Sequence, residues 1–299
     1  MSLREFFVLL LICTTWGLHF IVLKVTVDIT AKPIFYAACR MSVVAVLLIP
    51  FLKWHKGVMK PVLAAGLCYG ALNYGLLFPA LGMTSASAAA LTIELYVPFS
   101  IILSVIFLGE RIGIYRIMGI CCAFIGVAII ALSKPDEAAG PLFLLGIFLI
   151  MGAAMADAIG AVLVKSIQNV KPLELLAWFA VVGTCVLWPI SWMIEDEQLS
   201  AFDSQNLWPF LAALTYSIFA VSIISHASYY WLLQRLPIYI VSSSGLLTTL
   251  IAVCASILIL GEPLTPPLIF GGLMTLSGVA MILWRNSHHP KQVKPAQKT

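Results

Sequence analysis

Long apolar segments, separated by short polar loops, fill almost the entire chain. Ten of these segments have about the 20 residues that a helix needs to cross the hydrocarbon core of a bilayer. They lie at residues 5–26, 33–52, 62–82, 85–107, 112–132, 141–164, 172–194, 208–233, 237–260 and 267–285. This pattern predicts an all-α integral membrane protein with ten transmembrane helices.

A short motif is repeated at half the length of the chain. Leu-Gly-Glu occupies residues 108–110 and again residues 260–262, each time at the end of an apolar segment. Glycines follow the two copies at matching spacings, at Gly119 and Gly126 and at Gly271 and Gly278. Such repetition indicates two structural halves. Because each half holds five spans, the second half should be inverted relative to the first, an architecture typical of secondary transporters.

The loops predict the boundaries and the orientation of these halves. We expect the first repeat at residues 1–134, the second at 141–285, and a disordered basic cytoplasmic tail at 286–299. With cytoplasmic N- and C-termini, the inside loops carry most of the 17 basic residues, and the acidic cluster 195–197 falls outside. This distribution of charge obeys the positive-inside rule.

Composition narrows the class of protein further. Apolar residues make up 62% of the 299 residues and charged residues 10%, whereas soluble domains have about 45–50% and about 25%. No phosphate-binding glycine loop, metal-ligand spacing or nucleophile–base pair is recognisable. We therefore expect no cofactor, no metal site, no enzyme activity and no nucleic-acid partner. The expected partners are the lipid bilayer and a small-molecule substrate, and the protein is either a monomer or a homodimer.

Several motifs link the chain to a known family. The segment 16–24 reads Trp-Gly-x-x-Phe-x-x-x-Lys, a lone Arg40 lies in the second segment, and Pro98 precedes the first Leu-Gly-Glu motif. In their order and spacing these features resemble the drug/metabolite transporter superfamily, in particular the EamA-type ten-helix exporters. The resemblance implies a multi-pass carrier of the inner (cytoplasmic) membrane with a central cavity, often exporting amino acids or related metabolites. The chain departs from the family by placing Glu94 in a usually apolar stretch and Leu250 where a second proline would stand.

Glu94 is the most informative ionisable residue in the apolar segments. Pro98 lies four residues later and has no N–H, so the helix should kink and the carbonyl of Glu94 should lose its partner. Transporters build binding sites at such breaks in the middle of the membrane. The alternatives are a pair with Arg40 or a protonated carboxyl packed against a neighbouring helix.

Polar and aromatic residues occupy matching positions in the two halves. Asn73 and Tyr74 in the third segment correspond to Ser225 and His226 in the eighth, and either Tyr229 or Tyr230 should share a helix face with His226. These groups are suited to a substrate with a polar head, or they hydrogen-bond between helices and stabilise the bundle. The predicted substrate-binding residues are Trp16, His19, Asn73, Tyr74, Glu94, Tyr96, Trp178, His226 and Tyr230.

Charged residues inside a membrane are costly and need a partner, water or a function. We interpret Glu94, Asp157, Arg40 and Lys24 as candidates for proton coupling or for ion pairs. Asp157 has Arg40 or Lys165 as possible ion-pair partners, and Lys24 can extend to the outer headgroups. Arg40 offers a fork of donors for a carboxylate or phosphate.

These observations favour a secondary-active or facilitative transporter that exports small metabolites, amino acids or related compounds, by alternating access around a midplane cavity. Protons are a candidate coupling ion. The first alternative is a carrier of drugs, cations or nucleotide-type metabolites from the same superfamily. A membrane scaffold or an enzyme is the second alternative, although a scaffold has little need for carboxylates in the middle of the membrane.

Overall fold

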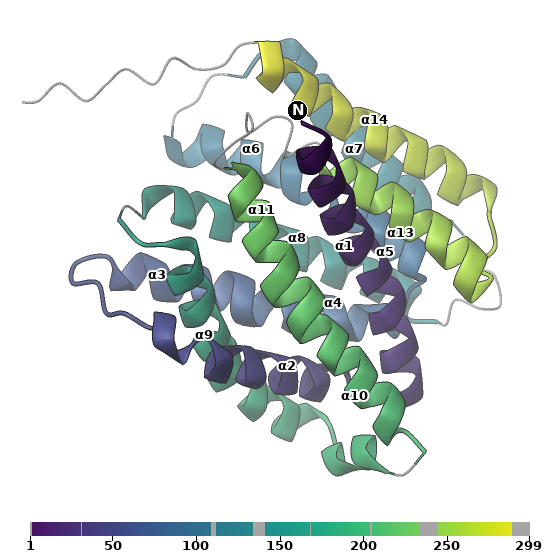
Figure 1. The fold of residues 1–299 in the computed structure, drawn as a ribbon. Coiled ribbons are helices and arrows are strands. Elements are labelled where there is room, and N and C mark those ends of the chain that lie inside the picture. The colour runs from purple at the N-terminus through teal and green to yellow at the C-terminus, as the bar shows by residue number, and fades with distance from the viewer. Residues whose placement is uncertain are drawn as a thin grey trace, which may run out of the picture.

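A bundle of helices makes up the part of the chain that the computed structural model describes, namely residues 2–30, 32–108, 112–133, 141–167, 169–203, 205–233 and 244–288 (Figure 1). In chain order the helices are α1 (Leu3–Thr30), α2 (Pro33–Leu47), η1 (Ile49–Phe51), α3 (Met59–Gly66), η2 (Leu67–Leu72), α4 (Asn73–Leu81), α5 (Ala86–Ile93), α6 (Tyr96–Leu108), α7 (Ile114–Leu132), α8 (Phe143–Ser166), α9 (Pro172–Ile194), η3 (Gln198–Phe202), α10 (Leu207–Thr215), η4 (Tyr216–Ser225), α11 (His226–Leu233), α13 (Ser244–Leu260) and α14 (Pro266–His288). Each of the ten apolar segments expected from the sequence contains a helix.

Eight helical segments among the described residues are long and apolar enough to cross a membrane. Three of them are composite: α3, η2 and α4 make up one, α5 and α6 a second, and α10 and η4 a third. Two further apolar helices, α2 and α13, are shorter, with 15 and 17 residues. Helix α14 continues to His288, and the rest of the expected tail lies outside the described residues.

Helices α2 and α9 are joined where α9 ends and α2 begins. The Glu195 carboxylate, 9% exposed, accepts hydrogen bonds from the backbone N–H groups of Ile34 (2.8 Å) and Phe35 (2.7 Å). The Ser191 hydroxyl donates a third bond to it at 2.7 Å. Pro33 opens α2 and the preceding Lys32 makes no side-chain cap, so Glu195 satisfies donors that would otherwise be unpaired.

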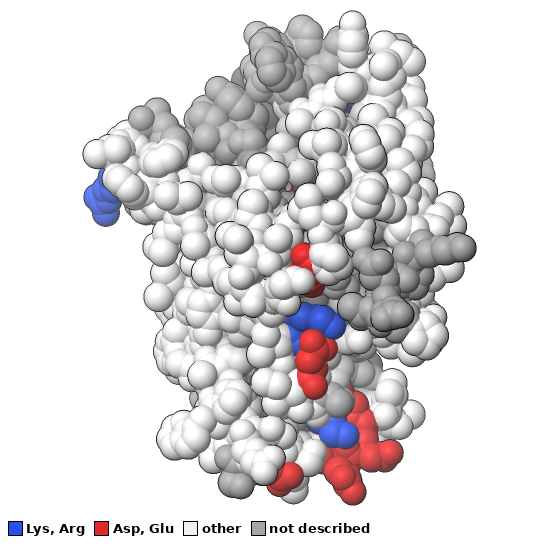
Figure 2. Space-filling model, turned by 90° about the vertical axis from the view of Figure 1, so that its right-hand side faces the viewer, with Lys and Arg blue, Asp and Glu red and all other residues white. Residues whose placement is uncertain are grey.

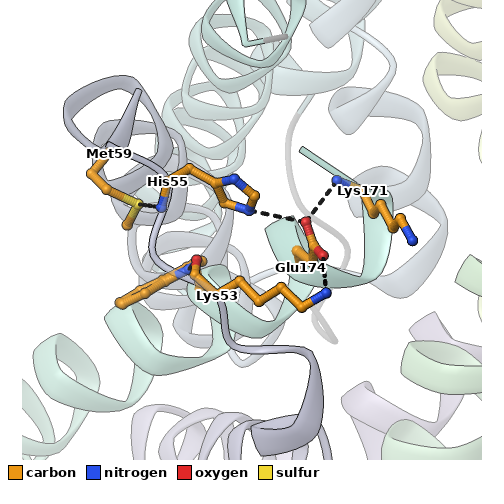
Figure 3. Close-up of polar contacts among 6 residues, drawn as sticks. Lys53, His55, Met59, Lys171 and Glu174 are labelled. Atoms are coloured by element: carbon orange, nitrogen blue, oxygen red, sulfur yellow. Dashed lines mark hydrogen bonds and ion pairs between the residues drawn. The ribbon is translucent and has the colours of Figure 1, made fainter. Parts of the chain in front are cut away.

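The same two helices are joined again at their other ends (Figure 3). Glu174, in the first turn of α9, accepts a hydrogen bond from the Lys171 backbone N–H at 3.0 Å. From the chain that follows α2, Lys53 Nζ lies 3.4 Å and His55 Nε2 3.0 Å from the Glu174 carboxylate. Because contacts hold both ends, α2 and α9 form a tied pair.

The contacts of Glu195 and those of Glu174 form two joints between α2 and α9, which lie at ends of the bundle with opposite charge. The acidic end carries Asp28, Glu195, Asp196, Glu197 and Asp203 against Lys24 and Lys32, and the basic end carries Arg4, Lys53, Lys56, Lys60 and Lys171 against Glu5 and Glu174. Figure 2 shows a face that is largely uncharged, with most of the acidic atoms in view gathered towards its lower end. An uncharged belt between charged ends suits a protein that crosses a bilayer.

Helices α7 and α14 run side by side (Figure 1) and meet through glycines. A Cβ atom added to Gly126 would lie 2.5 Å from the Gly271 carbonyl oxygen, and one added to Gly119 would lie 2.8 Å from that of Gly278. The backbones therefore touch directly, as small residues allow in membrane helices. The four glycines of the repeat are the ones that make this contact.

Two apolar clusters form most of the core. One is built around α2, α4, α9 and α10, and the other around α5, α6, α7, α8 and α14. Ile93, at the end of α5, packs against both clusters. The next residue, Glu94, therefore lies where the two clusters meet.

Candidate functional site

The fourth apolar segment is broken at Glu94, as Pro98 predicts. Helix α5 ends at Ile93 and α6 begins at Tyr96, so Glu94 and Leu95 lie in a turn between two half-helices. The prediction of a free Glu94 carbonyl is wrong, because the Val97 N–H donates to it at 3.1 Å. The tighter turn replaces the bond that proline removes.

The Glu94 side chain is 4% exposed and points to α13. Its Oε1 atom accepts a hydrogen bond from the Thr249 hydroxyl at 2.6 Å. Gly245, one turn earlier in α13, has no side chain, and a Cβ atom there would lie 3.5 Å from Glu94 Oε1 and 3.8 Å from the Tyr96 hydroxyl. The alternative of a pair with Arg40 is wrong, since the ion pairs among the described residues are Lys24–Asp28, Lys53–Glu174 and His55–Glu174.

Wide helical turns precede the matching polar residues of the two halves. The π-helix η2 ends directly before Asn73, and the π-helix η4 ends directly before His226. Such turns change the direction in which the following side chains project and are frequent at functional sites. Each half thus carries the same irregularity at the place where the repeat aligns Asn73 and Tyr74 with Ser225 and His226.

Asn73 holds Asp157 in place. The Asn73 side-chain nitrogen donates to Asp157 Oδ2 at 2.8 Å, and Asn73 is 8% exposed. Asp157 comes from α8 and is half-buried. Of the two possible ion-pair partners of Asp157, Arg40 does not pair with it, and the side chain of Lys165 lies outside the described residues.

Arg40 is almost completely buried, with 1% of its surface exposed, and its partners are neutral. The Ser222 hydroxyl accepts from Nε at 3.3 Å and from Nη2 at 3.0 Å. Nη1 lies 3.4 Å from His19 Nε2, and the guanidinium carbon lies 4.9 Å from the centre of the Tyr74 ring. A buried cation without a carboxylate is costly, which marks Arg40 as a group with unused binding capacity.

Ser217 extends this cluster into a network. Its hydroxyl lies 3.0 Å from His19 Nε2 and 2.5 Å from the Tyr36 hydroxyl. Ser222 in turn donates to the Ser217 carbonyl at 2.9 Å. The network therefore fixes His19 and Ser222, the two residues within hydrogen-bonding distance of the Arg40 guanidinium.

Three aromatic rings lie beside this network. The Trp16 ring centre lies 5.4 Å from that of His226 and 5.4 Å from that of Tyr229. The Trp16 Nε1 atom is buried and has no hydrogen-bond partner, although a buried indole N–H usually finds one. The predicted list names Tyr230, whose side chain lies outside the described residues, and it is Tyr229 that meets Trp16.

Electrostatic contacts connect these groups across the bundle. The Tyr96 hydroxyl is close enough to Glu94, Asp157 and Tyr229 to interact with each of them. His226 interacts in the same way with Arg40 and with His19. These side chains are only half-buried although they lie within the apolar segments of the chain, namely Trp16, His19, Tyr74, Tyr96, Asp157, His226 and Tyr229.

Two of the expected residues lie apart from this centre. Lys24 pairs with Asp28 at 3.0 Å near the acidic end. Trp178 donates from Nε1 to the Lys53 carbonyl at 2.9 Å, and its ring centre lies 5.7 Å from that of Trp54. Trp178 therefore belongs to the basic-end joint between α2 and α9.

The sequence reading missed the neutral groups that hold the charged ones. Tyr36, Ser217, Ser222 and Thr249 were not among the predicted site residues. One signal was present, because Tyr36 lies four residues before Arg40 and so on the same face of α2. The spacing of five between Ser217 and Ser222 fits a π-helix, which hydropathy does not reveal.

Comparison with known proteins agrees with this architecture. The model of the EamA-like transporter family matches residues 3–132 and 144–284. A probable amino-acid metabolite efflux pump of Escherichia coli (strain K12) is 25% identical over 96% of this chain and 98% of its own length. An uncharacterized transporter of Archaeoglobus fulgidus is 28% identical over 94% of this chain and 99% of its own length.

A solved structure titled "Crystal structure of protein" shares the fold, with a TM-score of 0.52 and 16% identity over 97% of this chain and 100% of that one. The family match confirms the resemblance noted in the sequence and the expectation of a membrane transporter rather than an enzyme. It covers both halves of the chain, almost from end to end. The chain belongs to the EamA-like transporter family.

Proposed function

We propose that this protein exports an amino acid or a related small metabolite across the cytoplasmic membrane. One observation carries the proposal: the interior holds one cation and two carboxylates that do not pair with each other. Arg40, Glu94 and Asp157 each have neutral hydrogen-bond partners among the described residues. Burying charges in such surroundings costs free energy. A ligand with one positive and one negative group offsets this cost, because it can pair with Arg40 and with a carboxylate.

The aromatic groups give the site its second property. Trp16 and Tyr229 present ring surface, and the unpartnered Trp16 N–H is a donor for the polar part of a ligand. In this arrangement Arg40 binds the substrate carboxylate through its fork of donors. Glu94 or Asp157 receives the ammonium group, and the rings contact the side chain.

Alternating access between two pseudo-symmetric halves is the second part of the proposal. We propose ten spans arranged as two inverted sets of five, with the basic end and both termini in the cytoplasm. The two π-turns before Asn73 and His226 support this layout, since they occupy equivalent positions of the two halves. Glu94 and Asp157 are the groups that would carry a coupled proton, because neither has a basic partner among the described residues.

Thermal-shift measurements on the purified chain test the ligand class. Amino acids should raise Tm, whereas amino-acid esters without the free carboxylate and carboxylic acids without the amine should not. Metabolite-export profiling of cells that overproduce the chain then names the substrate. In proteoliposomes, if a pH gradient leaves the flux unchanged and Glu94→Gln transports normally, the proton-coupled version of the proposal is wrong.

A cation carrier is the second candidate function. The interior holds two carboxylates and only one arginine, which favours a cationic ligand. Aromatic rings lie close by, and cations bind well over such rings. Quaternary amines are the distinguishing ligands in the thermal-shift experiment. If they raise Tm and amino acids do not, the export of amino acids is the wrong function.

A further inference from the structure

The carboxylate of Glu262 joins the two halves at the acidic end. It follows the end of α13, where Gly261 adopts a left-handed φ of +67° and turns the chain. One carboxylate oxygen accepts from the Ala86 N–H at 2.5 Å, and the other accepts from the Ser87 N–H at 3.0 Å and the Ser87 hydroxyl at 2.5 Å. The second copy of the Leu-Gly-Glu motif therefore does more than end a helix, because its glutamate binds the start of α5.

These bonds complete the N-terminus of α5. The Ser85 hydroxyl accepts from the N–H of Ala88 at 3.2 Å, so the first three N–H groups of α5 all have acceptors. A negative charge at this position also interacts favourably with the helix dipole. Helix α5 therefore depends on Glu262, a residue of the other half, for two of its three end bonds.

Helix α5 is a separate short unit that α13 holds at both ends. It has 8 residues, and the turn at Glu94 disconnects it from α6. At its far end Glu94 is bonded to Thr249 of α13. Movement of α5 away from α13 needs the release of these two side-chain contacts.

We propose that Glu262 is a releasable latch, which closes the acidic end between α5 and α13 and opens when substrate passes on that side. The proposal rests on the alternating access proposed above. Glu262 is only half-buried, so water can replace it at the helix end. A side-chain cap of this kind changes the ratio of two conformations by roughly tenfold, which biases a gate without locking it.

Glu195 provides a matched control with the same chemistry. Its carboxylate also accepts from two backbone N–H groups at a helix start, those of Ile34 and Phe35. It is buried, however, and the helices that it joins are tied again at the basic end through Glu174. A tied pair should not part during transport, so loss of Glu195 should leave the gate unchanged.

Thiol labelling tests the latch in full-length protein in nanodiscs, without any substrate. Ala90 is fully buried and lies one turn deeper than Ala86, where its carbonyl meets Thr249. A reporter Ala90→Cys, with the seven native cysteines replaced, should react with a membrane-impermeant maleimide roughly tenfold faster when Glu262→Gln is added. Addition of Glu195→Gln should leave the rate unchanged. Equal rates in all three proteins would overturn the latch.

Hydrogen exchange on the native-cysteine chain gives a second measurement in case the reporter folds poorly. Glu262→Gln should speed amide exchange throughout residues 86–93, and Glu195→Gln should act only at residues 34–35. Faster exchange confined to residues 86–87 would identify a static cap and refute the latch. A chain that shows the latch but transports no metabolite would instead refute the proposed function alone.

Discussion

Helix α7 meets α14 through bare backbone, whereas α5 meets α13 through charged and hydroxyl side chains. The first contact is formed by repeated glycines whose carbonyl oxygens leave no room for a Cβ atom. The second is formed by Glu94 with Thr249 and by Glu262 with the start of α5. Backbone packing of this closeness has one fitting arrangement, while side-chain bonds can be exchanged for water or ligand. We infer from this difference that α7 and α14 are a supporting pair of helices and that α5 and α13 are a pair that moves.

The largest effect is expected from filling the glycine contact. In Gly126→Ala the new Cβ atom would meet the Gly271 carbonyl oxygen and the Thr275 nitrogen, each at 2.5 Å. Overpacking of this kind costs about 1–3 kcal/mol, and we expect Tm to fall by roughly 2–10 °C. Gly113→Ala is the control, since nothing lies within 4 Å of a Cβ atom there. Equal Tm values would mean that α7 and α14 separate easily.

The next effect concerns the cationic part of the site. Arg40→Lys keeps the charge but loses the fork that Ser222 and His19 orient, so affinity for a carboxylate substrate should fall by roughly tenfold or more. Lys24→Ala removes only the pair with Asp28 and should change affinity less than about twofold. Binding isotherms on proteins of equal Tm measure both. If Lys24→Ala lost more affinity than Arg40→Lys, the anion site would have to lie near Lys24 at the acidic end.

A smaller effect is expected where α13 leaves space beside Glu94. In Gly245→Ala the added Cβ atom lies at ordinary contact distance from Glu94 Oε1 and the Tyr96 hydroxyl, at 3.5 and 3.8 Å. The fold should tolerate it, but a ligand group at Glu94 loses room, and affinity should fall by roughly tenfold. Gly152→Ala, which meets only the Leu76 side chain at 3.2 Å, should leave affinity unchanged. Unaltered binding in Gly245→Ala would exclude Glu94 as a ligand contact.

The sequence predicted where the helices lie far better than which helices pack against each other. Hydropathy placed a helix in all ten segments, because a bilayer sets both the length and the apolar character of a span. It did not reveal which helices face each other, since helices that are apolar all round have no distinct polar stripe. The pairing of α2 with α9, and the capping of α2 by Glu195, therefore came only from the structure.

The candidate site was predicted in part for a related reason. Ionisable residues stand out in an apolar segment, so Arg40, Glu94 and Asp157 were found. Their partners Ser222, Thr249 and Asn73 are ordinary polar residues, and only Asn73 was singled out. The sequence did hold a signal for Glu195 at the start of α2, where Pro33 begins the helix and no capping side chain precedes it. A helix start that lacks its own cap predicts an acceptor from elsewhere.

The last comparison concerns two neighbouring threonines of α13 that differ in their hydrogen-bond partners. The Thr249 hydroxyl donates to Glu94, whereas the Thr248 hydroxyl is buried without a hydrogen-bond partner. Thr249→Val deprives a buried carboxylate of its donor, which should cost about 1–3 kcal/mol. Thr248→Val replaces an unpaired hydroxyl by a methyl group and should be neutral or slightly stabilising. Thermal unfolding of the two variants measures the difference. If both lose the same stability, the hydroxyl of Thr249 does not hold Glu94, and the polar contact between α5 and α13 is no stronger than apolar packing.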